Sequence, residues 1–426
     1  MNTTCVPRGT VLALLAEGFF SRLSFGFISL ALPLYARQLG MSLAQIGILV
    51  SVSAVVSIVG RPLMGRAAAR FGLRRTLLAG MGLRSLVTLL LAGCWMPWHL
   101  FGVKALHGMA DAARKPAVDS LLAQAGGRKR AASMFAWYST ARAMAASIGR
   151  AGAGMLLALT AGQFGPVFLL ACLLSALPLV VVWLFIKEPP AMATQPEPQA
   201  EPPAPSEPAA QGQRRLLPIV SLGALMSGTA EMLRGLFPIL ATEYAGLTPA
   251  QTGSIYLAST LVTMAAGPVF GWLSDHVNRE VVLFIRSAAN ILSSAIYLCS
   301  PSFAGVLGAR MTDDVGKAAF RPAWGAMMTQ ASSADPRVRA RQMSVLGMGE
   351  DIGELAGPIV AGLLLSSGGL VALMATRIVL ATVTEIYAVC LTRRLNAHER
   401  NSPVEGPALH GALLRQGSIA HGTSAE

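Results

Sequence analysis

The sequence predicts an all-α integral membrane protein with twelve transmembrane helices in two pseudo-symmetric six-helix halves. The first observation is an internal repeat: residues 44–125, moved forward by 206 positions, align on the second half without a gap. Gln45 then meets Gln251, and Pro62 meets Pro268. The second observation is composition, since 53% of residues are hydrophobic and 13% are charged. The apolar runs are long enough to cross ~30 Å of hydrocarbon.

The apolar runs define the predicted spans in chain order. They are residues 10–36, 43–65, 76–97, 100–123, 133–160, 165–186, 216–242, 249–272, 280–300, 303–328, 342–366 and 368–391. The stretch between the sixth and seventh spans is rich in Pro, Ala, Gln and Glu and has no apolar period, so we expect an extended, disordered linker. The predicted organisation is an N-terminal half, a cytoplasmic linker, a C-terminal half and a cytoplasmic tail at residues 1–187, 188–215, 216–392 and 393–426.

Basic residues cluster in alternate connections between the spans. Examples are the cluster at 66–75 and the one at 128–130, whereas the connections near 98–99 and 243–248 contain no Lys or Arg. Of the basic residues in connections, only Arg37 breaks this pattern. By the positive-inside rule, both termini and the linker are cytoplasmic, as in a multi-pass protein of the inner membrane. The net charge of +13 is therefore a topology signal, and a nucleic-acid partner is excluded.

Several other classes of protein and site are excluded by missing patterns. The start has no small-residue cleavage site, so we expect no cleavable signal peptide. The five cysteines are scattered, which argues against disulfides and metal sites. No phosphate-binding GxxxxGK[ST] loop and no HExxH motif occur, so neither ATP hydrolysis nor metalloenzyme chemistry is expected. We expect a monomer in the lipid bilayer, without a cofactor and without enzymatic activity.

Charged residues lie inside four of the predicted spans, where each costs at least ~2.5 kcal/mol and marks a functional hypothesis. The fourth and tenth spans carry them in one register at helical spacing. These are Lys104, His107, Asp111, Arg114 and Lys115 in the fourth, and Arg310, Asp313, Asp314, Lys317 and Arg321 in the tenth. The first and seventh spans add Glu17 with Arg22, and Glu231 with Arg234. Asp111 matches Lys317 in the repeat, so we predict that the two stripes pair across the seam between the halves in one conformation and separate in the other.

Two connections carry related motifs. Residues 65–75 read GRAAARFGLRR and resemble the signature G-x-L-a-D-r-x-G-r-k of the major facilitator superfamily. The repeat partner at 271–279 reads GWLSDHVNR and keeps the acid, Asp275, that the first copy replaces with Ala69. The fourth span holds KALHG, similar to the family's R-x-x-q-G pattern. The glycines at 349–362 in the eleventh span resemble the antiporter motif, which in the family lies in the fifth span.

The resemblance covers nearly the whole chain outside the linker and tail. It implies a secondary active transporter that works by alternating access, with spans 1, 4, 7 and 10 lining a central cavity. The expected substrate-binding residues are Arg22, Lys104, Arg114, Lys115, Arg234, Arg310, Lys317 and Arg321. The expected proton-coupling residues are Glu17, His107, Asp111, Glu231, Asp313 and Asp314. Several Lys and Arg residues and few aromatics favour a small anionic or zwitterionic solute.

The same resemblance implies a latch at the cytoplasmic face, where the second span lies beside the eleventh. Gly65 and Gly271, the first residues of the two motifs, are expected to let helices approach closely. We hypothesise that Arg61 or Arg66 pairs with the acidic start of the eleventh span when this gate is shut. The expected gating residues are Gly65, Arg66, Arg70, Gly271, Asp275, Arg279, Glu350, Asp351 and Glu354.

Alternatives stay open at this point. The buried charges could be permanent salt bridges, especially Arg84 and Arg377 on supporting spans, and Arg286 is expected to extend to the cytoplasmic face. The side chain of Arg142 could face the cavity edge or the eighth span. A multidrug/H⁺ antiporter and a transport-inactive scaffold or receptor are the rival functions. A proton gradient is the expected energy source, and the displaced antiporter-like motif favours export.

Overall fold

The computed structural model describes residues 8–185, 207–276, 279–331 and 336–401, and all regular structure in these ranges is helical. The helices are α1 (Arg8–Gln38), α2 (Leu43–Phe71), α3 (Leu73–Ala92), α4 (Pro97–Leu159), α5 (Phe164–Phe185), α6 (Glu207–Arg234), α7 (Phe237–Ile239), the π-helical turn η1 (Leu240–Tyr244), α8 (Pro249–His276), α9 (Arg279–Cys299), α10 (Phe303–Ala331) and α11 (Pro336–Asn401). Each predicted span falls largely on one helix, except the seventh, which runs from α6 through α7 into η1.

Two of these helices contain two spans each. In a straight helix, residues 24 apart would be separated by about 36 Å. The side chains of Arg114 and Tyr138 instead lie 3.3 Å apart, so α4 folds back on itself between its two spans. In α11 the reversal is at Gly369, whose φ of 65° is accessible to glycine and unfavourable for other residues. The twelve predicted spans therefore correspond to twelve membrane-crossing segments.

Composition separates the purely apolar segments from the charged ones. Seven stretches of the described helices are long and apolar enough to cross a membrane, judged by length and composition alone. One of them, Val345–Leu391, has 47 residues and accommodates two crossings. Neither α4 nor α10 is among the seven, because both carry the charged stripes noted in the sequence. Their charges must therefore be ion-paired inside the protein or face a hydrated cavity.

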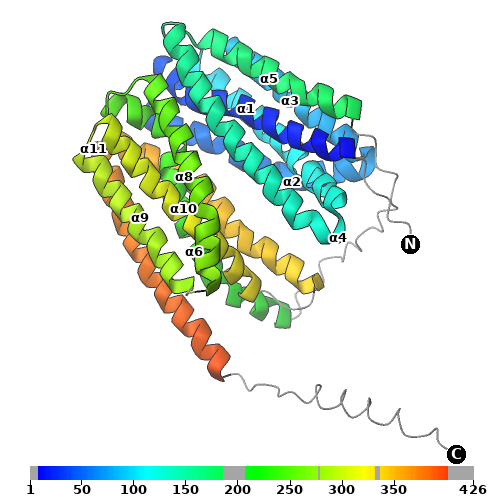
Figure 1. Cartoon of the computed structure of the whole chain (residues 1–426), viewed down its shortest axis with the longest axis vertical. Helices are drawn as coiled ribbons and strands as arrows, with labels where there is room; N and C mark the ends of the chain where they lie inside the picture. Colours follow the sequence, from blue (N-terminus) through cyan, green and yellow to red (C-terminus); the bar gives the residue numbers. More distant parts are fainter. Residues whose placement is uncertain (1–7, 186–206, 277–278, 332–335, 402–426) are drawn as a thin grey trace, which may run out of the picture.

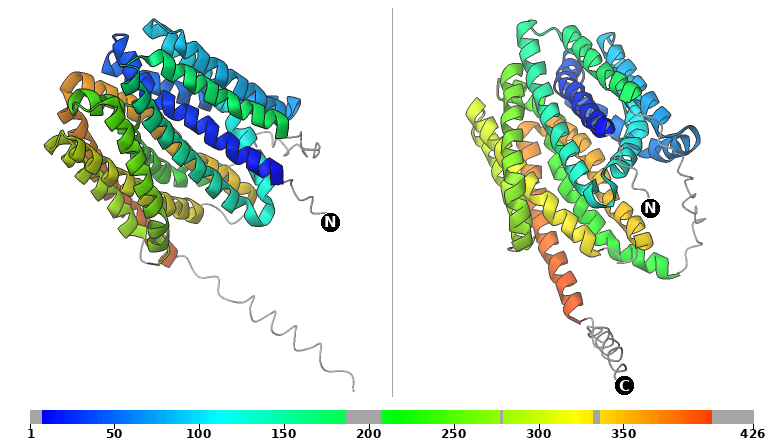
Figure 2. Two further views of the ribbon diagram at one scale, coloured as in Figure 1. Left: turned by 45° about the horizontal axis from the view of Figure 1, so that its top comes forward. Right: turned by 45° about the vertical axis from the view of Figure 1, so that its right-hand side comes forward.

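The two halves form separate bundles that meet along one seam (Figures 1 and 2). Helices α1 to α5 form the N-terminal half, and α6 to α11 form the C-terminal half. Across the seam α4 packs on α8, and α11 packs on α2. We call the end of the bundle with Arg8, Glu207 and Asn401 the terminal end. The turns at residues 39–42 and 245–248 lie at the opposite end.

Glycines bring the halves into backbone contact near the opposite end. A Cβ atom added at Gly47 of α2 would clash with the carbonyl oxygen of Pro358 in α11, and one added at Gly154 of α4 would clash with that of Pro249 in α8. Gly362 of α11 likewise faces the backbone of α2. Small residues are required where helices approach this closely in a membrane. The seam is therefore tightly closed on this side.

The glycines of α11 have a packing role as well. Added Cβ atoms at Gly349, Gly353 and Gly357 would collide with the backbone of α6. The glycines with the antiporter-like spacing therefore give α11 one face without side chains, and this face packs against α6. Gly65, in contrast, has no atom within 4 Å of an added Cβ, so the predicted close approach there is wrong. The last turns of α2 project clear of their neighbours, and Gly65 is exposed.

Three element boundaries differ from the sequence prediction. Helix α6 begins at Glu207, inside the stretch assigned to the linker, because EPAAQGQRRLL contains good helix formers ahead of the apolar run. Helix α11 continues to Asn401, beyond the predicted end of the second half. The seventh span is interrupted after Arg234, where Pro238 lacks the N–H needed to continue an α-helix, and it resumes as α7 and η1. The predicted linker residues 188–206 and tail residues 402–426 lie outside the described part of the chain.

Candidate substrate cavity

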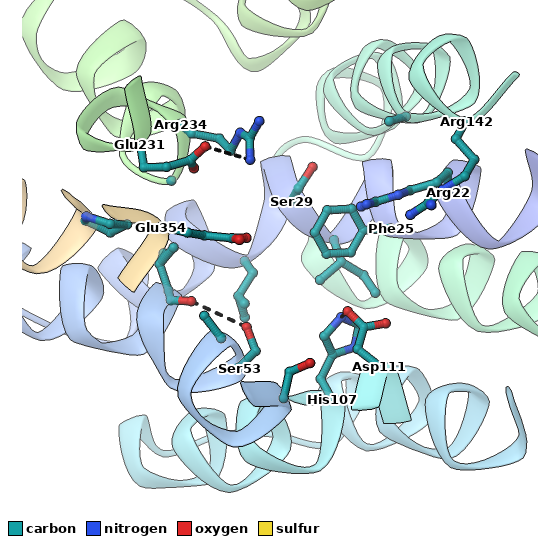
Figure 3. Close-up of a pocket in the computed structure, with 18 of the residues that line it drawn as sticks. Arg22, Phe25, Ser29, Ser53, His107, Asp111, Arg142, Glu231, Arg234 and Glu354 are labelled. Atoms are coloured by element: carbon teal, nitrogen blue, oxygen red, sulfur yellow. Dashed lines mark hydrogen bonds and ion pairs between the residues drawn. The ribbon is translucent and has the colours of Figure 1, made fainter. Parts of the chain in front are cut away.

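A cavity of ≈ 520 Å³ lies between the two halves (Figure 3). This volume is in the range of small-molecule binding sites. Helices α1, α2, α4, α6, α8 and α11 supply its described lining residues. Of the predicted site residues it brings together Arg22, Lys104, His107, Asp111, Lys115, Glu231, Arg234, Asp351 and Glu354.

The wall formed by the N-terminal half is mainly basic. The guanidinium carbon of Arg22 on α1 lies 4.9 Å from the ring centroid of Phe25. That of Arg142 on α4 lies 5.2 Å from the ring centroid of Tyr138. Cation–π contacts of this kind orient a guanidinium without neutralising it. Within the described residues Arg22, Lys104 and Arg142 form no ion pair, so their charges are available to a ligand.

The wall formed by the C-terminal half is mainly acidic. Glu231 on α6 binds Arg234, with 2.7 Å between Oε1 and Nη1. Asp351 on α11 accepts two hydrogen bonds from Arg61 on α2, at 3.0 and 3.3 Å. Glu354, one turn further along α11, lines the cavity and has no ion-pair partner among the described residues. One acid of this wall is therefore also available.

His107 and Asp111 make a polar patch on α4. Asp111 Oδ1 lies 3.5 Å from Arg84 Nη1, and Asp111 Oδ2 lies 3.9 Å from His107 Nε2. The His107 ring stacks on Phe25 with 5.7 Å between centroids. Both groups face the cavity, and Figure 3 shows them on its α4 side. They are in reach of solute and water, and their role in proton coupling stays a prediction.

Behind this wall, Glu17 and Arg114 form a closed pair. Their side chains are 0% and 2% exposed, and Arg114 Nη1 lies 2.7 Å from Glu17 Oε1. The Tyr138 hydroxyl donates to the other carboxylate oxygen at 2.8 Å. Neither member lines the cavity. The structure therefore does not place Arg114 where a substrate would bind, nor Glu17 where a solute could exchange a proton with it.

The charges of α10 are engaged inside the C-terminal half. Asp313 is fully buried and lies 2.6 Å from Lys317 Nζ, 3.1 Å from Arg377 Nη2 and 3.3 Å from Arg286 Nη1. The expectation that Arg286 extends to the cytoplasmic face is wrong, because this ion pair holds it in the core. Arg377 is enclosed with Asp313, which agrees with the alternative that buried charges on supporting spans are structural ion pairs. Asp313 is thus enclosed by three cations.

Asp314 and Arg310 complete this internal network. Arg310 Nε lies 3.0 Å from Asp314 Oδ2, and its guanidinium carbon lies 5.1 Å from the ring centroid of Tyr256. Arg150 of the other half lies over the same ring at 4.5 Å. Tyr256 of α8 therefore sits at the seam with a cation from each half.

Two sequence predictions about the tenth span need correction. No described residue that lines the cavity belongs to α10, so Arg310, Lys317, Asp313 and Asp314 lie behind the wall rather than on it. The predicted pairing of Asp111 with Lys317 does not occur in this conformation, since Asp111 is next to Arg84 and Lys317 binds Asp313 and Asp314. The charges on α10 are satisfied by neighbours in their own half. The side chain of Arg321 lies outside the described part.

Of the predicted gating residues, some contact the other half and others do not. The hypothesis that Arg61 or Arg66 pairs with the start of the eleventh span matches the contact of Arg61, which binds Asp351 in this state, and its link to a shut cytoplasmic gate stays a prediction. Arg66 and Arg70 are exposed at the end of α2. Glu350 instead accepts a hydrogen bond from the indole of Trp324 within the C-terminal half. The side chains of Asp275 and Arg279, and the surroundings of Gly271, lie outside the described part of the chain.

A second ion pair crosses the seam at the opposite end. Arg37 Nε lies 2.7 Å from Glu243 Oε1. The two residues are 206 positions apart, which is the repeat offset, so each is the repeat counterpart of the other. A residue that touches its own counterpart lies on the pseudo-twofold axis. Arg37, the exception to the charge pattern of the connections, is thereby explained.

The structure adds lining residues that the sequence did not single out. Arg150 lines the cavity beside Arg142, and Tyr256 and Thr260 of α8 complete the seam. A signal was present on α4, where residues 139, 142, 143, 146, 147 and 150 recur at helical spacing and all line the cavity. This second face of α4 belongs to the fifth predicted span, whose only charged residues at these positions are Arg142 and Arg150.

Comparisons with known proteins agree with this architecture. A sequence profile of the Major Facilitator Superfamily matches residues 14–233 and, in a second alignment, 219–421. The "Multidrug resistance protein MdtG" of Enterobacter lignolyticus is 31% identical over 116 residues, which is 26% of this chain and 28% of that protein. That of Citrobacter koseri is 27% identical over 136 residues, which is 31% of this chain and 34% of that protein. The chain thus matches about a third of the length of these relatives.

Solved structures resemble the fold over nearly the whole chain. The nucleoside transporter NupG superposes with a TM-score of 0.72 at 14% identity, covering 90% of this chain and 98% of that one. A bacterial homologue of the human lysosomal transporter Spinster, in an inward-facing and unoccupied conformation, gives 0.67 at 15% identity over 90% and 96%. At these identities the likeness concerns the fold alone.

Proposed function

The chain belongs to the major facilitator superfamily, whose members are membrane transporters rather than enzymes, and on that premise we propose that it carries a small anionic or zwitterionic solute by proton-coupled alternating access. The observation that supports the solute class is the cavity at the seam. Its walls present unpaired Arg22, Lys104 and Arg142, each able to bind carboxylate or phosphate oxygens.

The arrangement of the seam supports a state that is closed at the opposite end. Backbone contacts at Gly47 and Gly154 seal that end, and the Arg37–Glu243 pair crosses it. Alternating access requires that this seal open when the terminal end closes. By the positive-inside rule the terminal end is cytoplasmic, so the state is inward-facing in the inner membrane. A reporter fused at residues 190–212 and one at the C-terminus should both report a cytoplasmic location.

Protons are the proposed coupling ion. Of the predicted proton-coupling residues, His107, Asp111 and Glu231 line the cavity. A group that exchanges a proton with solvent during the cycle has to be accessible in at least one state, and these three meet that condition. Export is the favoured direction, because α11 carries the antiporter-like glycines and partial relatives are named as multidrug resistance proteins.

The same relatives make a multidrug/H⁺ antiporter the second candidate. Its substrates would be lipophilic cations, which need an aromatic, mainly apolar site. The described aromatic lining residues are Phe25 and Tyr256, apart from His107, and the wall near Phe25 is basic. These features favour the charged solute. A transport-inactive scaffold with the same fold is the third candidate.

Proton release or uptake by the purified protein distinguishes the three. The protein in weakly buffered detergent solution would receive, one at a time, sugar phosphates, dicarboxylates, amino-acid derivatives and the lipophilic cation tetraphenylphosphonium. A carrier of charged solutes should change the pH with a member of the first three groups, and the change should vanish in Asp111→Asn. A response to tetraphenylphosphonium alone would establish the multidrug alternative. No response to any compound would contradict proton coupling and favour the scaffold.

A further inference from the structure

The charges that line the cavity are segregated by half. Among the described lining residues, the N-terminal half contributes six bases and one acid, which are Arg22, Arg61, Lys104, Lys115, Arg142, Arg150 and Asp111. The C-terminal half contributes three acids and one base, which are Glu231, Asp351, Glu354 and Arg234. The two walls therefore carry opposite net charge across the seam.

Some of these lining charges are neutralised by ion pairs, and the others have no counter-ion in the described part of the chain. Arg61 with Asp351 and Glu231 with Arg234 neutralise each other. Asp111 is engaged by Arg84, which lies behind it. Among the described residues, five bases of the first wall then have no ion pair, which are Arg22, Lys104, Lys115, Arg142 and Arg150, and on the other wall Glu354 has none. Arg150 donates a hydrogen bond to Ser29 and lies over the ring of Tyr256, so Arg22 and Arg142 are the two guanidinium groups of this wall that remain for a ligand.

The free groups face the cavity from different sides. Figure 3 shows Arg22 and Arg142 together on the side of α1 and α4, with Glu354 across the cavity on α11. Phe25 and Tyr138 hold the two guanidinium groups through cation–π contacts at 4.9 and 5.2 Å. Two oriented guanidinium groups form a site for a carboxylate or phosphate, because their N–H donors match the geometry of paired oxygens.

We propose that the solute is dipolar: its anionic group binds between Arg22 and Arg142, and its cationic group binds Glu354, so that one molecule spans the seam. This inference rests on the proposed transport of a charged solute and narrows its class. A purely anionic solute would leave Glu354 uncompensated near the ligand, and a purely cationic one would face the basic wall. Like-charge and unpaired contacts of this kind discriminate between ligands.

A solute that bridges the halves has a mechanical consequence. Its two ends bind walls that move relative to each other during alternating access. Such a ligand binds best where the walls are closest, so it favours the occluded state through its differential affinity. A solute held by one wall would lack this effect. The segregation of charge therefore links recognition to the conformational step.

The test uses matched probes on the purified full-length protein in detergent. The dipolar probes are ω-aminobutyrate, ω-aminohexanoate and ω-aminooctanoate. Each is compared with the alkyl carboxylate and the alkylamine of the same length, and tetraphenylphosphonium is added as a lipophilic cation. The readout is the melting temperature as a function of probe concentration, since a ligand that binds the folded state raises it. We expect at least one dipolar probe to bind more tightly than its carboxylate, and the carboxylate more tightly than the amine.

Two variants assign the ends of the probe, and two more serve as controls. The double substitution Arg22→Gln/Arg142→Gln should weaken binding of the dipolar probe about tenfold or more and abolish that of the carboxylate. Glu354→Gln should weaken binding of the dipolar probe by a similar factor and leave binding of the alkyl carboxylate unchanged. Arg75→Gln and Asp119→Asn change exposed charges outside the cavity and serve as matched controls. They should bind every probe as the parent protein does.

The possible outcomes distinguish failure of the dipolar assignment from failure of the proposed transport of a charged solute. Equal binding of dipolar probe and carboxylate, unchanged by Glu354→Gln, would overturn the dipolar assignment and leave transport of an anionic solute standing. Binding of tetraphenylphosphonium alone would overturn both. The inference would also be overturned if none of the three dipolar probes raised the melting temperature.

Discussion

At the scale of single residues, the charges in this bundle serve two different purposes. Those that line the cavity are partly unpaired, whereas those behind its walls are enclosed in ion pairs. Glu17 and Arg114 are 0% and 2% exposed and joined at 2.7 Å. A charge buried in low dielectric is costly unless a partner and hydrogen bonds compensate it. We therefore expect loss of one member of an enclosed pair to destabilise the fold, and we expect the unpaired groups to be the ones that meet a ligand.

Removal of one member of an enclosed pair should destabilise the protein strongly. Arg114→Met leaves the Glu17 carboxylate buried with the Tyr138 hydroxyl alone, and breaking such a pair costs about 3–5 kcal/mol. Glu17→Gln/Arg114→Met should restore most of the stability, because no uncompensated charge remains. The measurement is thermal unfolding in detergent. The control, Lys115→Met, changes the next residue, which lines the cavity without an ion pair among the described residues, and should cost less than about 1 kcal/mol.

If Arg114→Met and the double variant unfold at the same temperature, the pair does not stabilise the fold. The same comparison would then argue for an exchangeable proton on Glu17, as the sequence had suggested.

Residue partners were the least predictable feature from sequence. Spacing within one helix indicated which charges share a face, and Arg22, Lys104, His107 and Glu231 were correctly expected to meet at one site. Spacing does not tell which neighbouring helix supplies the counter-ion. Asp111 was matched with Lys317 through the repeat, yet its partner is Arg84 on α3. The repeat aligns positions in the two halves, and aligned positions touch each other only on the pseudo-twofold axis.

At the scale of helices, contact across the seam depends on glycine. Gly47 on α2 and Gly154 on α4 place the halves backbone to backbone near the opposite end. The repeat, the spans and their order were all readable from apolar periodicity, because the membrane fixes the length of each segment. The exact ends of the helices could not be predicted in this way, because helix-forming residues at Glu207 and beyond residue 392 continue the backbone hydrogen bonding outside the apolar runs.

A large side chain at Gly47 should prevent the opposite end from closing. In Gly47→Leu the new side chain collides with the carbonyl oxygen of Pro358, a backbone atom that cannot rotate away as the end of a side chain can. A single cysteine at Ser29, which lines the cavity, should then react faster with a membrane-impermeant maleimide added outside whole cells. Gly102→Leu is the control, because nothing lies within 4 Å of an added Cβ at Gly102. Equal labelling rates in the two variants would show that the glycine contact does not close the seam.

At the scale of the whole molecule, the two halves are joined at the opposite end on their pseudo-twofold axis. The Arg37–Glu243 pair that joins them there is 43% and 34% exposed. Exposed ion pairs contribute about 0.2–1 kcal/mol, so this pair biases the state that the glycines make possible. About 1 kcal/mol corresponds to roughly a fivefold change in the ratio of two states. The pair is therefore a bias on the gate and not its main closure.

Charge reversal should expose that bias. Arg37→Glu places two carboxylates together on the axis and should favour opening of the opposite end several-fold. Arg37→Glu/Glu243→Arg should restore the parent ratio, since the pair is re-formed in the opposite sense. The rate of cysteine labelling at position 29 from outside the cell reports the change. Loss of rescue in the double variant would mean that the two side chains do not pair in the membrane.

The central claim, that one cavity is exposed alternately at the two ends, is tested most directly by two distances in the same protein. Spin labels at residues 39 and 245 flank the Arg37–Glu243 pair, and labels at 71 and 217 lie at the terminal end of the two halves. Electron–electron resonance on the protein in liposomes would measure both pairs in the parent and in Gly47→Leu. We predict that the first distance lengthens and the second shortens in the variant. Lengthening at one end with no change at the other would contradict alternating access.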